Sequence, residues 1–172
     1  MPPEPAFHYA FRPMIFADLD WIAKWLANPH VAAWWNDDVE EEVENIAAHI
    51  GSASVKPYML EIDGRTAGYI QSYDPHAEAG HPYQDQPPGT LGIDQMIGEP
   101  DLVGLGHGPR MIMEFARLRF DEGVPRLIID PDPDNHRAIR AYTKAGFTIF
   151  DRRTTIYGPA LMMRRDLEDK TV

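Results

Sequence analysis

The spacing of hydrophobic and polar residues predicts the secondary structure of the first third of the chain. Residues alternate weakly over His8–Pro13, which indicates a strand. In Asp18–Ala27 the apolar side chains recur at helical spacing, so we expect a helix that is capped by its first residue and stopped by Pro29. A second helix is expected from a cap at residues 36–38 to about His49.

The middle of the chain predicts a β-hairpin, a long loop and a further strand. Pro57–Ile62 and Thr66–Tyr73 are apolar runs, and Asp63-Gly64-Arg65 between them is a strong signal for a tight hairpin turn. Asp74–Pro88 holds several proline, glycine and charged residues, so we expect a loop there. Loops of that length in compact domains are often functional. Gly89–Ile97 reads as the next strand.

The last third of the chain predicts two helices and three strands. The first helix has apolar residues on one face, the second follows a capping turn at Pro131–Asn135, and Gly146 follows the second helix as a C-terminal cap. The expected elements are the helix Arg110–Phe120, the strand Arg126–Ile129, the helix His136–Ala145, and the strands Phe147–Arg153 and Leu161–Arg165 with Tyr157-Gly158-Pro159 between them.

The order of these elements, β α α β β β α β α β β, predicts a mixed α/β fold. A strand–helix–strand crossover lies at its centre, and such crossovers join parallel neighbouring strands. The chain has 172 residues, which is a common length for one domain. We therefore expect residues 1–172 to form a single domain.

The charge of the chain narrows the classes of partner. Lysine and arginine number 16 and aspartate and glutamate 27, for a formal net charge of −11. This balance counts against nucleic acid or an anionic membrane as the main partner, because both favour basic patches. It allows a cationic ligand, although an acidic surface also serves solubility alone.

Several classes of chemistry are excluded by what the sequence lacks. There is no cysteine, so disulfides, thiolate metal sites and a cysteine nucleophile are ruled out. The histidines lack partners at metal-ligand spacing, and no Gly-x-Ser-x-Gly elbow exists, so we expect neither a metal nor a serine hydrolase. No apolar run is long enough to span a membrane and residues 1–5 lack a signal-peptide pattern, so a cytoplasmic protein is expected.

Glycines cluster at Gly104, Gly106 and Gly108, between a predicted strand and a predicted helix. Bare backbone at a helix start offers N–H groups and a partial positive charge, which suit an anion such as a pyrophosphate. Pro109 fits the first helical turn, and Arg110 adds a formal charge. The spacing matches neither a Walker loop nor a dinucleotide fingerprint, and a tight structural turn is the alternative for this loop taken alone.

A second pattern follows the next predicted strand. Asn135, Ala138 and Tyr142 are spaced three and four residues apart, so they share one face of the predicted helix. A carboxamide at the helix start and a phenol further along the same face suit an extended ligand. The alternative for Tyr142 is a half-buried packing residue.

Together, the Gly-x-Gly-x-Gly loop and the string Asn-x-x-Ala-x-x-x-Tyr-x-x-x-Gly-Phe resemble the GNAT N-acetyltransferases. The resemblance covers nearly the whole chain and implies a splayed central sheet with helices on both faces. Within that superfamily the chain is similar to the aminoglycoside 6′-N-acetyltransferases. The matching segments are His30-Val-Ala-Ala-Trp34-Trp35, Gly68-Tyr-Ile-Gln71-Ser-Tyr73, Gly92-Ile-Asp94-Gln95, Thr154-Thr155 and Gly158-Pro-Ala160.

The resemblance implies acetyl-CoA as co-substrate, bound where two parallel strands splay apart. The strand would pair with the pantetheine arm, the glycine loop would hold the pyrophosphate, and Asn135 would hydrogen-bond the pantetheine. Tyr142 would protonate the departing thiolate. The implied cofactor-binding residues are Gln95, Met96, Ile97, Val103, Gly104, Leu105, Gly106, His107, Gly108, Pro109, Arg110, Asn135, Ala138 and Tyr142.

The resemblance also implies a site for a cationic primary amine. The amine must lose a proton before it attacks a thioester, and Asp94 matches the carboxylate that would accept it. Asp130 matches a second substrate-binding carboxylate, with a turn-starting aspartate as the alternative. Trp35 and Gln71 match further substrate contacts.

Three departures from the family pattern bear on the substrate. Val103 stands where glutamine or arginine is frequent, and we expect this change to be tolerated because backbone N–H groups hold the phosphates. Tyr157 stands in place of an acidic residue, and His81-Pro82-Tyr83 replaces tryptophan in the long loop. Both changes leave the expected acetylation intact and make the affinity for aminoglycosides an open question.

The leading prediction is therefore an acetyl-CoA-dependent N-acetyltransferase that acts on an aminoglycoside-like amine. Transfer is expected to be direct, in a ternary complex, because no cysteine exists to carry the acetyl group. The alternatives are a siderophore- or hydroxylysine-type N-acyltransferase and a non-catalytic CoA-binding sensor. The expected partners are acetyl-CoA and a cationic amine, without nucleic acid or membrane, and the protein is expected as a monomer or homodimer.

Overall fold

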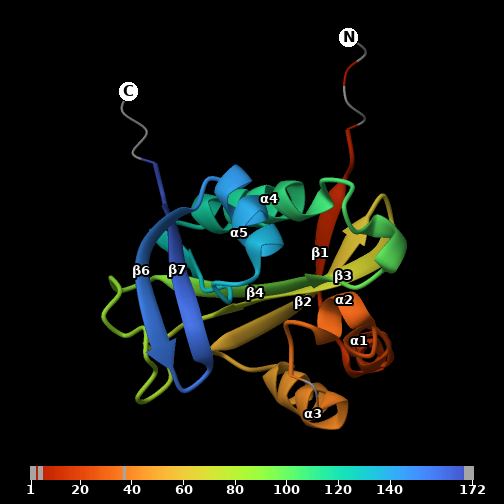
Figure 1. Cartoon of the computed structure of the whole chain (residues 1–172), viewed down its shortest axis with the longest axis horizontal. Coiled ribbons are helices and arrows are strands. Elements are labelled where there is room, and N and C mark those ends of the chain that lie inside the picture. The colour runs from red at the N-terminus through yellow and green to blue at the C-terminus, as the bar shows by residue number, and fades with distance from the viewer. Residues whose placement is uncertain (1–2, 4–5, 37, 169–172) are drawn as a thin grey trace.

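A computed structural model describes residues 3, 6–36 and 38–168 of the chain. Seven strands form one sheet in the order β1-β2-β3-β4-β5-β7-β6 (Figure 1). All neighbouring strands are antiparallel except β4 and β5, which are parallel. The strands are β1 (Tyr9–Pro13), β2 (Val55–Ile62), β3 (Arg65–Tyr73), β4 (Leu91–Ile97), β5 (Arg126–Ile129), β6 (Thr148–Thr155) and β7 (Gly158–Asp166).

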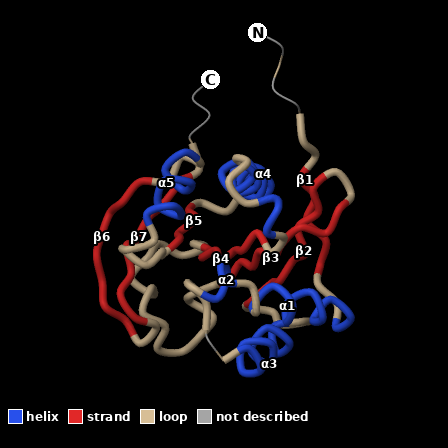
Figure 2. Tube along the Cα trace, turned by 45° about the vertical axis from the view of Figure 1, so that its right-hand side comes forward, coloured by secondary structure: helices blue, strands red, loops and turns tan. Residues whose placement is uncertain are grey.

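Helices cover both faces of this sheet. Helices α4 and α5 lie on one face, and α1, α2 and α3 lie on the other (Figures 1 and 2). The predicted mixed α/β fold is thus confirmed. Of the helices that the structure describes, none is long and apolar enough to cross a membrane. The helices are α1 (Leu19–Leu26), α2 (Pro29–Ala32), α3 (Val39–His49), α4 (His107–Asp121) and α5 (His136–Lys144), with 3-10 turns at Phe16–Asp18 and Pro100–Leu102.

The sheet splays between its two parallel strands. Strands β4 and β5 pair only at Leu91 with Leu127 and at Gly92 with Ile128, whereas β4 continues to Ile97. Glycine is required at this point because a Cβ on Gly92 would lie 2.0 Å from Cζ of Tyr73. The tyrosine ring of β3 therefore packs directly on the backbone where the parallel pairing ends.

Alternate residues of the central strands belong to different cores. Ile93 packs in the core beneath α4 and α5, together with Phe115. Met96 faces the other side and packs with Trp25 in the core beneath α1 and α3. A third, smaller core on that second side lies under the loop between β3 and β4 and includes Ile128 of β5. The second face is therefore covered in two parts, by the first three helices and by this loop.

Local structure differs from the prediction at several element ends. Pro29 does not simply stop the first helix, because it opens the short helix α2, where its missing N–H costs nothing. The helix after the glycine loop begins at His107, three residues earlier than expected. The last two strands also extend further, so that only Ile156 and Tyr157 separate β6 from β7.

The two predicted helix caps have different outcomes. The Asp18 side chain makes no capping hydrogen bond to α1. Its carboxylate instead accepts two hydrogen bonds from Arg12, each at 2.9 Å, and one from the Ile15 N–H. Asp38 does cap α3 by accepting from the Glu41 N–H at 3.1 Å, while residue 37 of the predicted cap lies outside the described residues.

Candidate active site

Asp94 belongs to a hydrogen-bond network of polar side chains on the face of the sheet that α3 covers. The register of β3 and β4 places Gln71 opposite Asp94, and Gln71 Nε2 donates to Asp94 Oδ2 at 2.8 Å. Gln71 Oε1 accepts from the Tyr69 hydroxyl and lies 3.2 Å from His49 Nδ1. Burial raises the pKa of Asp94 against the opposing effect of the Gln71 hydrogen bond. The predicted pair of Asp94 and Gln71 is thus brought together.

Trp35 is partly buried and packs against the core beneath α1 and α3. It follows α2 in a turn, and its ring stands edge-on to Tyr69 with the ring centroids 6.1 Å apart. Trp34, in contrast, is 48% exposed. Of the two adjacent tryptophans, Trp35 is therefore the one that contacts these polar residues, through Tyr69.

Asp130 follows β5 and is tied to the long loop between β3 and β4. The Tyr83 hydroxyl donates to Asp130 Oδ2 at 2.5 Å, and Tyr83 itself is buried. Burial and the nearby charge of Asp94 raise the pKa of Asp130 to about 7. The two predicted carboxylates therefore interact electrostatically. Asp130 also has a partner 47 residues away, which a mere turn-starting residue does not need.

Tyr142 lies on the opposite face, in the core beneath α5. Gln95 Nε2 donates to its hydroxyl oxygen at 3.0 Å, which leaves the hydroxyl hydrogen available to another acceptor. Burial raises the pKa of Tyr142 to about 12. Gln95 Oε1 is buried without a hydrogen-bond partner among the described residues. Such an acceptor in a functional site is satisfied when a ligand N–H reaches it.

The glycine loop ends in a left-handed turn at the start of α4. Gly104 and Gly106 have φ of 80° and 83°, which favours glycine at both positions, and Gly106 is the N-cap of α4. The first N–H groups of the helix have no partner within it and can bind an anion. Gly108 lies in the first turn of α4, where a Cβ would make only an ordinary contact of 3.9 Å with Ala141 Cβ of α5.

The side chains of His107 and Arg110, in the first turn of α4, contact Phe7 and Tyr9 near the start of the chain. His107 is buried, and its Nδ1 lies 2.8 Å from the Tyr9 hydroxyl. The Arg110 guanidinium lies 6.0 Å from the ring centroid of Phe7 and interacts with Tyr9. At this point, therefore, the backbone N–H groups of the first turn of α4 are the groups that could hold an anion. Asn135 Oδ1 likewise caps α5 by accepting from the Ala138 N–H at 3.2 Å.

Comparison with known proteins agrees with this geometry. Residues 15–155 match a family model described as an acetyltransferase (GNAT) domain. The chain belongs to the GNAT acetyltransferase family. It is 33% identical over 162 residues to an aminoglycoside N(6′)-acetyltransferase type 1 from Klebsiella pneumoniae, covering 88% of this chain and 80% of that protein. On this evidence the protein is an N-acetyltransferase.

Solved structures of similar proteins contain both ligands. The structure of AAC(6′)-Ib with paromomycin and acetyl-CoA has a TM-score of 0.84 and 31% identity, and covers 92% of this chain and 93% of that one. The complex of the same enzyme with CoA and kanamycin has a TM-score of 0.81 and 32% identity, and covers 92% and 95%. This likeness supports the splayed GNAT sheet described above.

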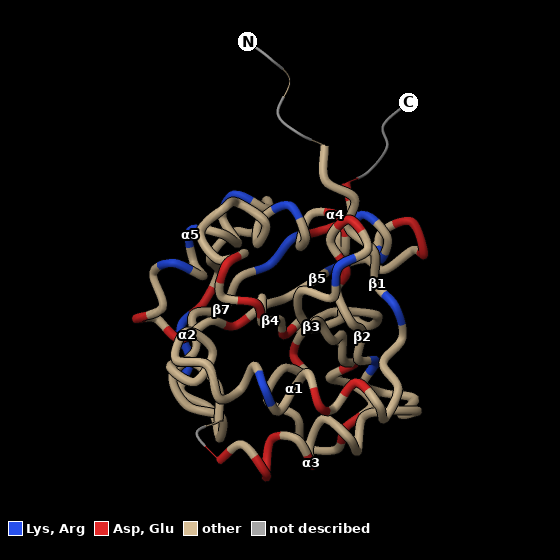
Figure 3. Tube along the Cα trace, turned by 90° about the vertical axis from the view of Figure 1, so that its right-hand side faces the viewer, with Lys and Arg blue, Asp and Glu red and all other residues tan. Residues whose placement is uncertain are grey.

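Two features near this GNAT protein's candidate site are not predicted by the sequence: a basic residue beside the glycine loop, and the assembly of His81, Tyr83 and Tyr157 into one cluster. The first is Arg137 of α5, whose Nη2 would lie 3.0 Å from a Cβ on Gly104. One face of α5 is basic, because it carries the exposed residues Arg137, Arg140 and Lys144. Figure 3 shows basic positions on α5 and acidic positions along α3. The spacing of three and four residues between the basic residues of α5 was a readable signal in the sequence.

The second feature is the aromatic cluster that the long loop forms beside the carboxylates. The His81 ring lies 5.4, 5.2 and 6.1 Å from the rings of Tyr73, Tyr83 and Tyr157. These residues come from β3, the long loop and the turn between β6 and β7. No pattern in the sequence connects such distant segments.

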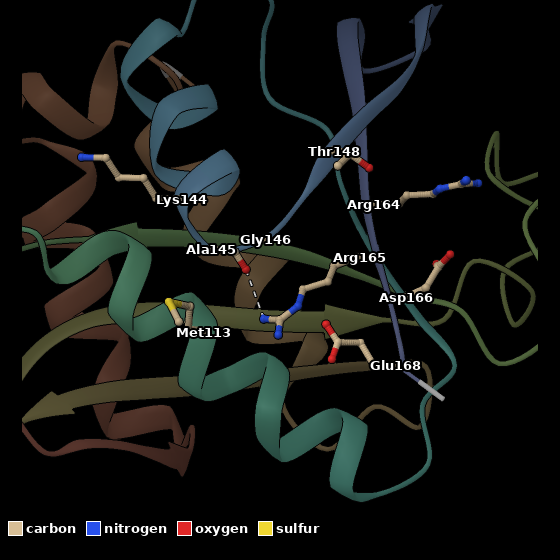
Figure 4. Close-up of a pocket in the computed structure, with 9 residues that line it drawn as sticks. All are labelled: Met113, Lys144, Ala145, Gly146, Thr148, Arg164, Arg165, Asp166 and Glu168. Carbon is tan, nitrogen blue, oxygen red and sulfur yellow. Dashed lines mark hydrogen bonds between the residues drawn. The ribbon is translucent and has the colours of Figure 1, made fainter. Parts of the chain in front are cut away.

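A hollow of about 340 Å³ lies elsewhere, between the end of α5 and strands β6 and β7 (Figure 4). Lys144, Arg164 and Arg165 line it together with Asp166 and Glu168. Arg165 donates to the Ala145 carbonyl at 3.1 Å, as the dashed line in the figure marks. None of the predicted site residues lines this hollow, so it is separate from the candidate active site.

Proposed function

We propose that the protein transfers the acetyl group of acetyl-CoA to a primary amine of an aminoglycoside, as a 6′-N-acetyltransferase does. The observation that carries this proposal is the placement of Asp94 and Asp130 on one face of the sheet, beside the point where β4 and β5 part. Two interacting carboxylates there suit a cationic amine. The similarity to enzymes named for this activity supports it further.

The residues of the other face fit acetyl-CoA. The orphaned Gln95 Oε1 is an acceptor for an amide N–H of the pantetheine, and β4 continues through Met96 and Ile97 without a β5 partner. The backbone from Val103 to the first turn of α4 fits the pyrophosphate. Arg137 beside Gly104 adds a positive charge at the same place. When bound there, acetyl-CoA supplies the thioester that the amine attacks.

On the substrate face, Asp94 binds the ammonium and accepts its proton. A carboxylate whose pKa is raised by burial is a better base near neutral pH than an ordinary aspartate. Gln71 orients this carboxylate through the hydrogen bond to Oδ2. Asp130 binds a second polar or cationic group of the substrate. Trp35, beside Tyr69, is the further substrate contact that the resemblance implies.

On the cofactor face, Tyr142 protonates the departing thiolate. With a pKa of about 12 its hydroxyl carries a proton over the whole physiological range. The hydrogen bond from Gln95 occupies the hydroxyl oxygen as acceptor, so its hydrogen is directed elsewhere. Direct transfer needs no covalent enzyme intermediate, in keeping with a sequence without cysteine.

The aromatic cluster favours a substrate whose amine is carried on a ring. Burial lowers the pKa of His81, so this ring is neutral at neutral pH and does not repel a cation. Tyr157 is 62% exposed and lies beside His81. Aromatic faces bind the apolar C–H face of a sugar while the carboxylates bind its amino groups.

A thiol-release assay tests this function. Purified protein is incubated with acetyl-CoA and, separately, kanamycin, tobramycin, a lysine derivative and a polyamine, and free thiol and product mass are followed. Thiol release with one acetyl group added to an aminoglycoside supports the proposal. Turnover confined to the lysine derivative would favour the siderophore-type alternative, and acetyl-CoA binding without release on the whole panel would favour a sensor.

A further inference from the structure

The long loop between β3 and β4 is anchored to β6 by a bidentate ion pair. Arg153 Nη1 and Nη2 donate to the two carboxylate oxygens of Asp85 at 3.0 and 2.7 Å. Arg153 Nη1 also donates to the Pro82 carbonyl at 3.3 Å, and its Nε donates to Asp151 at 2.8 Å. The Asp85 side chain is exposed, but the bidentate geometry and the further bonds to Pro82 and Asp151 make this contact more specific than a single surface ion pair.

Further hydrogen bonds hold the loop to itself and to β5. Gln84 Nε2 donates to the Glu78 carbonyl at 2.7 Å, and a ring nitrogen of His76 lies 2.9 Å from the Gln86 carbonyl oxygen. Gln86 Oε1 accepts from Arg126 of β5 at 3.2 Å. These hydrogen bonds give the loop a defined structure.

These anchors place Tyr83 against Asp130. The Tyr83 ring is 1% exposed, packs with Ile128 and Met162, and has the Arg153 guanidinium 5.8 Å from its centroid. Its hydroxyl then meets Asp130 Oδ2. A carboxylate that accepts a hydrogen bond on one oxygen is fixed in orientation and keeps its second oxygen for another donor.

We propose that Tyr83 is a positioning residue of the active site, which orients Asp130 and stabilises its anionic form so that its second oxygen binds a cationic group of the substrate. This inference rests on the proposed function, because it assumes that Asp130 contacts the substrate. Asp94 is positioned by Gln71 from β3, and Asp130 is positioned by Tyr83 from the loop. The orientation of each carboxylate is therefore set by a hydrogen bond from a different segment of the chain.

The surroundings of Asp130 disfavour its charged form, and the hydrogen bond from Tyr83 opposes them. Asp94 of β4 faces it with a like charge, while Tyr73 of β3, Tyr142 of α5 and Tyr157 of the β6–β7 turn contribute phenols. Burial and the Asp94 charge raise the pKa of Asp130, and the Tyr83 hydrogen bond counteracts them. Without that hydroxyl the pKa of Asp130 rises further, and a protonated acid no longer attracts an ammonium.

The variant Tyr83→Phe tests the inference, because it keeps the packed ring and removes only the hydroxyl. Steady-state rates are measured from pH 5.5 to 9 with saturating acetyl-CoA and varied aminoglycoside. We expect the acidic limb of the pH profile of kcat/KM to shift to higher pH by about one unit. A hydrogen bond to an ion changes a protonation equilibrium, here that of Asp130, about tenfold. The KM for the amine should rise about tenfold at pH 6.5 and recover by pH 9. An unmoved limb would overturn the proposal.

A matched control and a direct titration separate this role from a merely structural one. Tyr58→Phe also loses a hydrogen bond, the one that its hydroxyl accepts from Arg119 at 3.1 Å on the α4 side of the sheet, and should leave the limb in place. Carbon-13 NMR of the Asp130 carboxyl should show its titration moved to higher pH in Tyr83→Phe. That shift without turnover of any aminoglycoside would refute only the proposed function. Turnover with an unmoved titration would refute only the role of Tyr83.

Discussion

Asp94 and Gln95 are successive residues of β4 and face opposite sides of the sheet. Asp94 is hydrogen-bonded to Gln71 on the side that α3 covers, and Gln95 is hydrogen-bonded to Tyr142 on the side of α5. Pairing with β5 ends just before them, at Gly92. In the proposed reaction this short segment therefore serves both ligands, with the proton acceptor on one side and the proton donor on the other.

Replacing Tyr142 with phenylalanine should lower kcat by about 10²-fold, the usual contribution of a general acid. The KM for acetyl-CoA should change little, because the ring and its packing remain. The variant also loses the acceptor for Gln95 Nε2. The comparison variant Gln95→Leu removes the same hydrogen bond, together with the Oε1 acceptor proposed for the pantetheine, but keeps the Tyr142 hydroxyl, so it should change the KM for acetyl-CoA more than kcat. A wild-type kcat in Tyr142→Phe would assign the protonation of the thiolate to water or another group.

Replacing Arg137 with glutamine should weaken the binding of acetyl-CoA. The guanidinium lies beside Gly104, so its loss should raise the KM for acetyl-CoA about tenfold and leave kcat unchanged. The control Arg117→Gln removes another exposed arginine, one that is paired with Glu114 and Asp121 on α4, and should change neither constant. Equal KM values in the two variants would remove Arg137 from the cofactor site.

Replacing Gly92 with alanine should destabilise the protein by about 1–3 kcal/mol, the usual cost of overpacking a core. The new Cβ would lie 2.0 Å from the Tyr73 ring, so the ring or β4 must move. Gly108→Ala is the control, because its Cβ meets only Ala141 at 3.9 Å and alanine favours the helix. Urea unfolding measures both, and equal midpoints would contradict the close packing of Tyr73 on β4.

Asp130 should also make stability depend on pH. Its pKa in the folded protein is about 7, above the value of about 3.9 for an unfolded chain. The folded state thus favours the protonated acid, and this contribution is present below pH 4 and lost as pH rises through 7. Asp130→Asn should therefore raise the melting temperature at pH 8 relative to wild type, and not at pH 4. An equal effect at both pH values would contradict the raised pKa.

The sequence predicted most of the fold because local patterns determine it. The Asp63-Gly64 turn, the periodicity of α4 and the Gly146 cap depend on neighbouring residues only, and each is found in the structure. The ends of elements were less predictable. Asp18 makes its hydrogen bonds to Arg12 and to the backbone of Ile15 instead of capping α1, a choice that the position of β1 decides.

The candidate site was predictable where a motif carries it and not where the tertiary structure assembles it. Asp94, Asn135 and Tyr142 lie in strings that resemble a known family. The contact of Tyr83 with Asp130 depends on the folded path of a long loop, which Arg153 of β6 anchors. The orientation of His107, toward Tyr9 and away from the proposed ligand, likewise depends on β1 packing beside α4.

The most direct test of this account compares wild type with Asp94→Asn in acetyl transfer to kanamycin. Thiol release, product mass and the Kd for acetyl-CoA are measured, with Asp121→Asn on the surface of α4 as control. We predict monoacetylated kanamycin from wild type and from the control, and a kcat about 10²–10³-fold lower in Asp94→Asn with unchanged acetyl-CoA binding. Wild-type turnover of kanamycin by Asp94→Asn would contradict the account.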